Sequence, residues 1–137
     1  MAPILFAGSI AADRPIRIFN NGKLARDFTY IDDIIEGIVK ITEHPEQASE
    51  DTAGIPAVIY NIGHGSSMQL MDFIHILERN LGKEAQKEYV GMQPGDVYQT
   101  WADTRKLERD FHYKPTTSLE EGITRFAQWY KEYYKNL

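Results

Sequence analysis

The sequence contains no cysteine. Disulfide bonds, thiolate metal ligands and cysteine nucleophiles are therefore excluded. Histidine is also scarce, and none of the four residues has the i, i+4 spacing of a helical metal pair; they are His44, His64, His75 and His112. We therefore expect no metal site.

Long apolar runs and concentrated positive charge are absent as well. No run approaches the roughly 18 apolar residues of a membrane span, and the first residues lack the basic region of a signal peptide. The formal net charge is -5, and the basic residues are scattered along the chain. Such a distribution gives no electrostatic footprint for nucleic acid or an anionic membrane. We therefore expect a cytoplasmic protein that binds neither nucleic acid nor membrane.

Recognisable catalytic pairs are missing too. No lysine has a tyrosine four residues before it, so the chain lacks the Tyr-x-x-x-Lys pair in which the lysine cation lowers the tyrosine pKa and makes it a base. Ser66 and Ser67 lie near His64, but this position suits a helix cap better than a hydrolase site. We therefore expect no catalytic residue in this chain.

The sequence does have enough apolar residues for a core. It has 137 residues, of which 42% are hydrophobic, and this predicts one domain over 1–137. Helical spacing predicts helices over 3–12, 32–43, the stretch from Leu70 to Leu81, 104–110 and the C-terminal stretch. Strands are predicted near 16–19, at 58–62 and at 87–92, and the polar segment 45–56 is predicted to be a mobile loop.

Five polar patterns mark the ends of these predicted elements. Asn20 to Lys23 and Gln93 to Asp96 predict turns. Capping-box spacing occurs at Ser66 with Gln69 and at Ser118 with Glu121, and Asp103 is a candidate N-cap for the helix over 104–110.

The stretch from Arg26 to Ile34 changes from strand chemistry to an acid-started helix within nine residues. The helix has one apolar stripe; its members are Ile31, Ile34, Ile35, Ile38 and Val39. Arg26 lies just ahead of this join, where a guanidinium could meet an anion. Taken alone, Arg26 fits a solvated loop position better than a binding site.

A glycine pattern, Gly63-x-Gly65-x-x-Met68, lies between the predicted strand and helix. Dinucleotide sites place glycines at such a junction, where pyrophosphate approaches a helix N-terminus. Met68 stands where close helix packing needs Gly or Ala, so we interpret the glycines as a tight turn and expect no cofactor-binding residue here.

Polar and aromatic residues that could converge on one ligand come from separate loops: Phe19, Asn20, Arg26, Gln93 and Asp96. Arginine offers a donor fork suited to phosphate oxygens, and a carboxylate can accept ribose hydroxyls. The residues alone give only a weak indication of a nucleotide ligand.

Several ordered motifs together resemble the C-terminal part of extended short-chain dehydrogenase/reductase nucleotide-sugar epimerases, in particular UDP-glucuronate 4-epimerases. They are Ile18 to Lys23, Arg26 to Ile34, Tyr60 to Gly63, Met92 to Val97, and Ala102 with Asp103. The resemblance covers essentially the whole chain. It implies a small mixed α/β substrate-binding domain that is a fragment of a longer enzyme and lacks most of the Rossmann sheet.

Carried over by position, the resemblance implies that Arg26 contacts the substrate diphosphate, that Phe19 and Asn20 lie against uracil, and that Asp96 approaches the ribose. Many relatives have arginine where this chain has Gln93, which puts a phosphate contact there in doubt. Thr100 and Trp101 are implied near the sugar.

The implied parent enzyme oxidises sugar C4 transiently with NAD, and its base, NAD site and Rossmann portion lie outside this chain. The fragment itself is expected to be inactive, and the parent is expected to be a homodimer. Two alternatives stay open: a UDP-galactose 4-epimerase or nucleotide-sugar dehydratase fragment, and a stand-alone module that binds a protein through its aromatic last helix.

Overall fold

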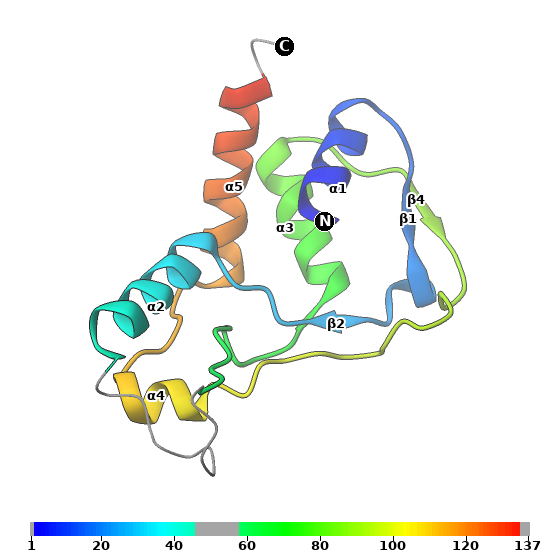
Figure 1. The fold of residues 1–137 in the computed structure, drawn as a ribbon. Coiled ribbons are helices and arrows are strands. Elements are labelled where there is room, and N and C mark those ends of the chain that lie inside the picture. The colour runs from blue at the N-terminus through cyan, green and yellow to red at the C-terminus, as the bar shows by residue number, and fades with distance from the viewer. Residues whose placement is uncertain (1, 46–57, 135–137) are drawn as a thin grey trace. The chain divides into compact units, whose positions relative to one another are not determined.

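The computed structural model describes residues 2–45 and 58–134 (Figure 1). Over these residues the chain is a small mixed α/β protein with five α-helices and two two-stranded sheets. The predicted α/β class is therefore confirmed. The predicted loop over 45–56 falls, except for its first residue, outside the described residues.

The chain divides into two compact units. One lies within Met1–Arg26, Met68–Gln99 and Ser118–Leu137, and the other comprises Asp27–Ser67 and Thr100–Thr117. Each unit is described by itself below. That 1–137 acts as one substrate-binding domain, without most of a Rossmann sheet, stays a prediction.

The first unit contains three helices: α1 (Ala2–Ala11), α3 (Leu70–Leu81) and α5 (Leu119–Tyr134). Helix α3 is the centre of the core, because it buries a stripe at helical spacing; its members are Leu70, Phe73, Ile74 and Leu77. Gly82 ends α3 in the left-handed conformation that glycine adopts without strain. Its N–H donates to the carbonyl of Glu78 at 2.9 Å.

Helix α5 packs against α3. Its N-terminus confirms the predicted capping pattern, because the N–H of Glu121 donates to Ser118 Oγ at 3.2 Å. Ile123, Ala127 and Tyr130 are buried, whereas Tyr133 is exposed. The packed face of α5 therefore includes the small Ala127 as well as the aromatic Tyr130.

Two short sheets hold the loops of the first unit. Strand β1 (Ile16–Ile18) pairs in parallel with β4 (Lys87–Tyr89), and the two lie side by side in Figure 1. Strand β2 (Ala25–Arg26) pairs antiparallel with β3 (Met68–Gln69). Between β1 and β2 lies the 3-10 turn η1 (Phe19–Gly22), which confirms the predicted turn.

The second unit contains α2 (Ile31–Glu43) and α4 (Arg105–Phe111). Its core consists of apolar residues that these helices and the segments beside them supply: Leu107, Phe111 and Tyr113, with Ile41, Tyr60 and Ile62 packed against them. Gly37 permits the close approach of α2, since a Cβ there would lie 3.0 Å from Ile62 and 3.1 Å from Tyr113.

Three sequence predictions are wrong in detail. The segment 58–62 is part of no strand within the described residues, although its composition is strand-like. Ser66 does not cap α3, since β3 occupies Met68–Gln69 and Gln69 is the residue at the N-cap. Helix α4 begins at Arg105, one residue later than predicted, although the Asp103 carboxylate accepts the N–H of Arg105 at 3.2 Å as a capping side chain does.

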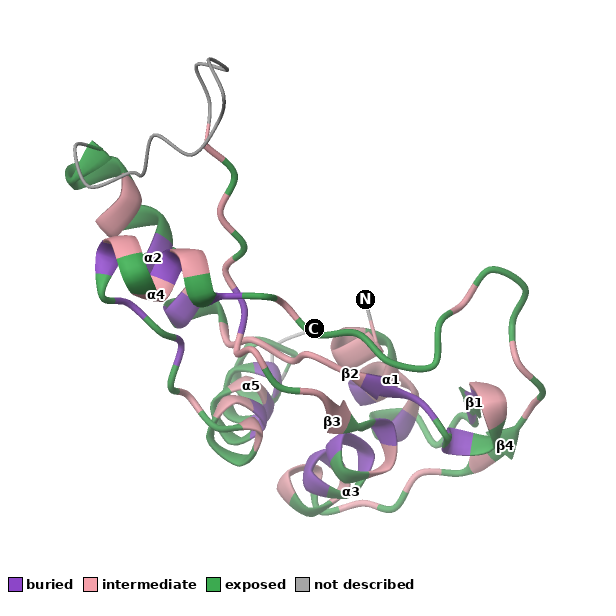
Figure 2. Cartoon of the chain, turned by 90° about the horizontal axis from the view of Figure 1, so that it is seen from below, coloured by how far each residue is buried: buried purple, intermediate pink, exposed green. Residues whose placement is uncertain are grey.

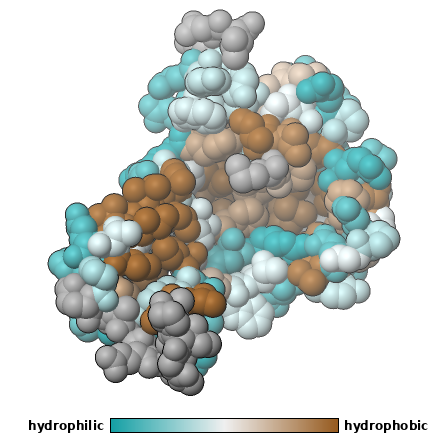
Figure 3. Space-filling view, in the orientation of Figure 1, coloured by the Kyte–Doolittle hydropathy of each residue, from teal (hydrophilic) through white to brown (hydrophobic). Residues whose placement is uncertain are grey.

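The apolar stripe of α2 does not face the core of its unit. The buried residues of this helix are Asp33 and Gly37. Figure 2 accordingly shows α2 mainly in the colours of intermediate and exposed residues. Ile34 is half-buried, whereas Ile31, Ile35, Ile38 and Val39 are exposed, and Figure 3 shows a hydrophobic patch over α2.

Candidate functional site

The candidate site in the first unit is centred on Arg26, the last residue of β2. Its Nη1 donates to the carbonyls of Ala25 at 2.8 Å and Tyr98 at 3.5 Å, and its Nη2 donates to Asp96 Oδ1 at 2.5 Å. Three partners thus hold one guanidinium in place. Both the Arg26 and Asp96 side chains keep 27% of their surface exposed, so a ligand can still reach them.

Asp96 is positioned by the predicted turn. The N–H of Asp96 donates to the carbonyl of Gln93 at 3.1 Å, and Gly95 has a φ of +81°, a value that glycine adopts without strain. The N–H of Val97 donates to the Asp96 carboxylate at 2.9 Å. The turn and its neighbour together fix the acceptor that faces Arg26, while the Gln93 side chain is exposed.

The segment of Phe19 and Asn20 is hydrogen-bonded to the residues that follow β4 and lead into this turn. The N–H of Asn20 donates to the carbonyl of Gly91 at 3.3 Å, and the Asn20 side-chain amide donates to the carbonyl of Lys23 at 2.9 Å. The Arg17 guanidinium lies 5.4 Å from the centre of the Phe19 ring, within cation–π range. The aromatic ring is therefore held in a half-buried position.

The structure thus brings Arg26 and Asp96 into direct contact. It also ties Phe19 and Asn20 to the segment just before Gln93. Thr100 belongs to the second unit, where its carbonyl accepts the Ser67 hydroxyl at 2.6 Å. Trp101 lies in the same unit and is exposed.

Sequence reasoning missed two contributions to this region. The Tyr98 carbonyl contacts Arg26, but a backbone acceptor has no signature in side-chain chemistry. The Arg17 guanidinium lies over the Phe19 ring. The sequence offered one indication of this contact, the position of Arg17 on β1 two residues before an aromatic residue.

The glycine loop of the second unit is organised by Asp27. The Asp27 carboxylate accepts the N–H groups of His64 at 3.1 Å, Gly65 at 3.0 Å and Ala102 at 2.9 Å. A Cβ on Gly63 would lie 2.5 Å from the Ala102 Cβ, so this position admits no side chain. The loop amides already bind a carboxylate, which fits a structural turn better than a pyrophosphate cradle.

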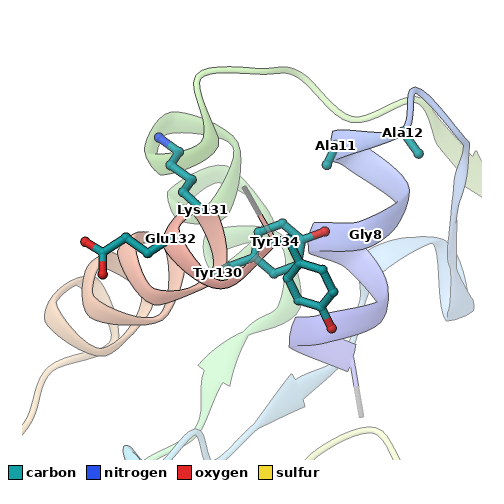
Figure 4. Close-up of a pocket in the computed structure, with 7 residues that line it drawn as sticks. All are labelled: Gly8, Ala11, Ala12, Tyr130, Lys131, Glu132 and Tyr134. Atoms are coloured by element: carbon teal, nitrogen blue, oxygen red, sulfur yellow. The ribbon is translucent and has the colours of Figure 1, made fainter. Parts of the chain in front are cut away.

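A groove between α1 and α5 is an alternative site in the first unit (Figure 4). It has a volume of about 560 Å³. Its lining is mostly small and aromatic: Gly8, Ala11, Ala12, Tyr130, Lys131, Glu132 and Tyr134. Lys131 donates to the carbonyl of Asn80 at 2.6 Å, so its ammonium is already engaged. The groove lacks the convergent polar groups of a small-molecule site.

A basic cavity of about 500 Å³ lies beside α4 in the second unit. Its arginines are also paired, Arg105 with Asp103 at 2.5 Å and Arg109 with Asp110 at 2.6 Å. Arg105 holds the pKa of Asp103 down to about 2 by hydrogen bonding to it. With both guanidiniums neutralised by carboxylates, the cavity is a poorer anion site than its composition indicates.

No helix among the described residues is long and apolar enough to cross a membrane. Within the same residues, no group of three or more histidine, aspartate or glutamate side chains is placed to hold a metal ion.

Comparison with known proteins identifies relatives over nearly the whole chain. Protein CapI of Staphylococcus aureus is 40% identical over 98% of this chain and 43% of its own length. A probable UDP-glucuronate 4-epimerase of Rhizobium meliloti is 37% identical over 98% of this chain and 42% of its own length. The chain therefore spans less than half the length of these curated relatives.

Comparison with solved structures also finds UDP-glucuronate epimerases similar to this chain. The UDP-glucuronic acid 4-epimerase of Bacillus cereus, in complex with UDP-glucuronic acid and NAD, has a TM-score of 0.81 and 35% identity, over 98% of this chain and 40% of that one. A family model described as GDP-mannose 4,6 dehydratase matches residues 4–126. The chain therefore belongs to this family of extended short-chain dehydrogenase/reductase epimerases and dehydratases of nucleotide sugars, and it is related to the NAD-dependent UDP-glucuronate 4-epimerases.

Proposed function

We propose that this chain is the C-terminal, substrate-binding part of an NAD-dependent UDP-sugar 4-epimerase that acts on UDP-glucuronate. The observation that carries the proposal is the Arg26–Asp96 pair, a cation and an acceptor fixed side by side with part of their surface exposed. The relatives named for UDP-glucuronate epimerisation support the choice of sugar.

In this proposal Arg26 binds the diphosphate and Asp96 accepts a ribose hydroxyl. A guanidinium that is already oriented loses less conformational entropy when it binds phosphate oxygens. Phe19 and Asn20 then lie against the uracil ring, Gln93 borders the phosphates without a charge of its own, and Thr100 contributes near the sugar. The chain supplies binding energy remote from the reacting carbon, which orients the sugar for the chemistry.

NAD and the catalytic base belong, in this proposal, to the part of the parent enzyme outside this chain. The chain lacks a Tyr-x-x-x-Lys pair. The glycine loop after residue 62 does not fit a pyrophosphate, because Asp27 already accepts its His64 and Gly65 amides. When bound, NAD supplies transient hydride acceptance at the sugar, and this chain alone is predicted to be inactive.

Titration of the chain with UDP, GDP and uridine tests the proposal. UDP is expected to bind at least about tenfold more tightly than uridine, because charged hydrogen bonds to the phosphates contribute roughly 1.5–3 kcal/mol each. It is also expected to bind more tightly than GDP. Equal affinity for UDP and GDP, or no difference between UDP and uridine, would contradict the proposed ligand.

An activity assay tests whether catalysis belongs to the part of the parent enzyme outside this chain. The purified chain with NAD is expected to leave UDP-glucuronate unchanged, and turnover by the chain alone would contradict the assignment of catalysis to the remainder of the parent. The parent enzyme, assayed on UDP-glucuronate and UDP-galactose, is expected to prefer the former. Preference for UDP-galactose, or formation of a dehydrated sugar, would favour the alternative enzyme activities.

A further inference from the structure

Arg17 differs from most arginines of this chain in what its guanidinium contacts. Most of them form ion pairs with carboxylates: Arg26, Arg79, Arg105, Arg109 and Arg125. Within residues 2–45 and 58–134, Arg17 forms no such pair, and its guanidinium lies over the Phe19 ring, 5.4 Å from the ring centre. The contact that the fold gives this cation is therefore an aromatic ring.

Strand β1 places Arg17 and Phe19 on the same side of the chain. Ile16 and Ile18 are buried, and side chains alternate between the two faces along an extended strand. Arg17 is exposed, and Phe19, the residue directly after the strand, is half-buried. Both side chains thus lie on the face that points away from the core, where the guanidinium covers one face of the ring.

The backbone that carries Phe19 is fixed by hydrogen bonds on both sides. The N–H of Val90 donates to the carbonyl of Ile18 at 3.0 Å, before Phe19. After it, the N–H of Asn20 donates to Gly91 at 3.3 Å and that of Asn21 donates to Val90 at 3.1 Å. With the backbone held, the Phe19 ring is the part of this segment that can still turn, and the Arg17 guanidinium restricts that rotation.

We propose that Arg17 is a positioning residue for base recognition, which holds the Phe19 ring in the orientation that packs against uracil. The inference rests on the proposed function, in which Phe19 lies against that base. A ring whose orientation is already set loses less conformational entropy when a ligand packs against it. Arg17 would then act on the ligand through Phe19, without touching the phosphates.

A role for Arg17 as a positive charge alone predicts a different result. A charge attracts every anionic ligand, so its loss would weaken inorganic pyrophosphate and UDP alike. A positioning residue for the base affects UDP, which contains uracil, and leaves pyrophosphate unaffected. Comparison of the two ligands therefore separates the two roles.

Titration calorimetry with UDP and with pyrophosphate makes this comparison. Arg17→Ala is expected to weaken UDP binding about two- to fivefold, the range of an exposed cation–π contact, and to leave the affinity for pyrophosphate unchanged. Arg17→Lys is expected to retain most of the UDP affinity, because an ammonium group also binds the face of an aromatic ring. Equal UDP affinities of Arg17→Lys and Arg17→Ala would overturn the proposal.

Arg14→Ala is the matched control. Arg14 is exposed, belongs to the same unit and lies outside β1, so its replacement removes the same charge without touching the ring. This variant is expected to bind UDP like the unsubstituted chain. An equal loss of UDP affinity in Arg14→Ala and Arg17→Ala would overturn the proposal, and so would an equal loss of UDP and pyrophosphate affinity in Arg17→Ala.

Fluorine NMR measures the ring contact without a ligand. In a chain labelled with fluorophenylalanine, the Phe19 signal is identified by its loss in Phe19→Leu. Arg17→Ala is expected to shift the Phe19 signal and to leave the signals of the buried Phe73 and Phe111 in place, which also shows that the variant is folded. An unshifted Phe19 signal would contradict the role of Arg17.

The outcomes distinguish this inference from the proposed function on which it rests. If the unsubstituted chain does not bind UDP, the proposed function fails and the role of Arg17 fails with it. If the unsubstituted chain binds UDP and Arg17→Ala binds it equally well, the proposed function stands and the role of Arg17 alone is overturned.

Discussion

Asp96 accepts a hydrogen bond from Arg26 at 2.5 Å across 70 residues of sequence, and the two side chains are equally exposed. A pair of this kind on a protein surface contributes little to stability, typically below about 1 kcal/mol. Its effect is on orientation, because the guanidinium fork can no longer rotate freely. The pair is therefore more informative about ligand binding than about folding.

The substitution Asp96→Asn separates these two effects. Asparagine keeps the size of the side chain and one acceptor but removes the charge that holds Arg26. The free energy of unfolding in urea is expected to change by less than about 1 kcal/mol. UDP affinity is expected to fall by roughly two- to fivefold, equivalent to about 0.5–1 kcal/mol. A large loss of stability with unchanged affinity would show that the pair is structural.

Gly63→Ala tests the packing of the glycine loop. The added Cβ would lie 2.5 Å from Ala102 and 3.1 Å from Asp27 Oδ2, so the loop must shift. We expect a loss of about 1–3 kcal/mol in the free energy of unfolding, measured in urea. Gly91→Ala is the control, because a Cβ there meets nothing within 4 Å. Equal stability of the two variants would contradict the close contact.

The raised pKa of Tyr113 predicts that the free energy of unfolding falls at alkaline pH. Burial, with the negative charges of Glu36 and Asp33 adding to it, raises the pKa of Tyr113 from 10.0 to about 12. The folded state therefore favours the neutral phenol. This contribution is fully present below pH 10 and is lost as the pH rises towards 12.

Tyr113→Phe isolates that contribution. It removes the hydrogen bond that the hydroxyl donates to the Asp33 carbonyl at 2.6 Å, at a cost of roughly 1 kcal/mol near neutral pH. Between pH 10 and 12, thermal unfolding of the variant is expected to change less steeply than that of the unsubstituted chain. Parallel pH profiles for the two proteins would contradict the assignment.

Local structure followed from the sequence wherever short-range chemistry decides it. The Asn20 to Lys23 turn, the Gln93 to Asp96 turn and the Ser118 cap are all confirmed. The periodicity of the stretch from Leu70 to Leu81 also predicted helix α3. In each case neighbouring residues supply both the signal and the contacts that satisfy it.

Predictions failed where the outcome depends on a distant partner. The segment 58–62 has strand composition, but a strand also needs a neighbour to pair with, and the described residues provide none. The side of α2 that packs within its unit could not be foreseen from its apolar stripe, because the close approach is at Gly37, which has no side chain to signal it. Within the candidate site, Arg26 and Asp96 were named separately, and only the fold could bring them into contact.

The roles of the site residues stay predictions, and Arg26 is the one on which the others depend. Replacing Arg26 by alanine directly tests whether its side chain binds the diphosphate. Arg79 offers a matched control in the same unit, because it too is an arginine paired with a carboxylate, Glu120, at 2.6 Å. Both alanine variants lose one ion pair, and Arg26→Ala also loses the hydrogen bonds to the carbonyls of Ala25 and Tyr98, so Arg26→Ala is expected to be the less stable of the two.

Titration calorimetry of UDP against Arg26→Ala and Arg79→Ala is the most direct measurement. Arg26→Ala is expected to weaken UDP binding by about 10- to 100-fold, because a charged hydrogen bond to phosphate is lost. Arg79→Ala is expected to bind UDP like the unsubstituted chain. Equal UDP affinity of the Arg26→Ala variant and the unsubstituted chain would contradict the proposed role of Arg26.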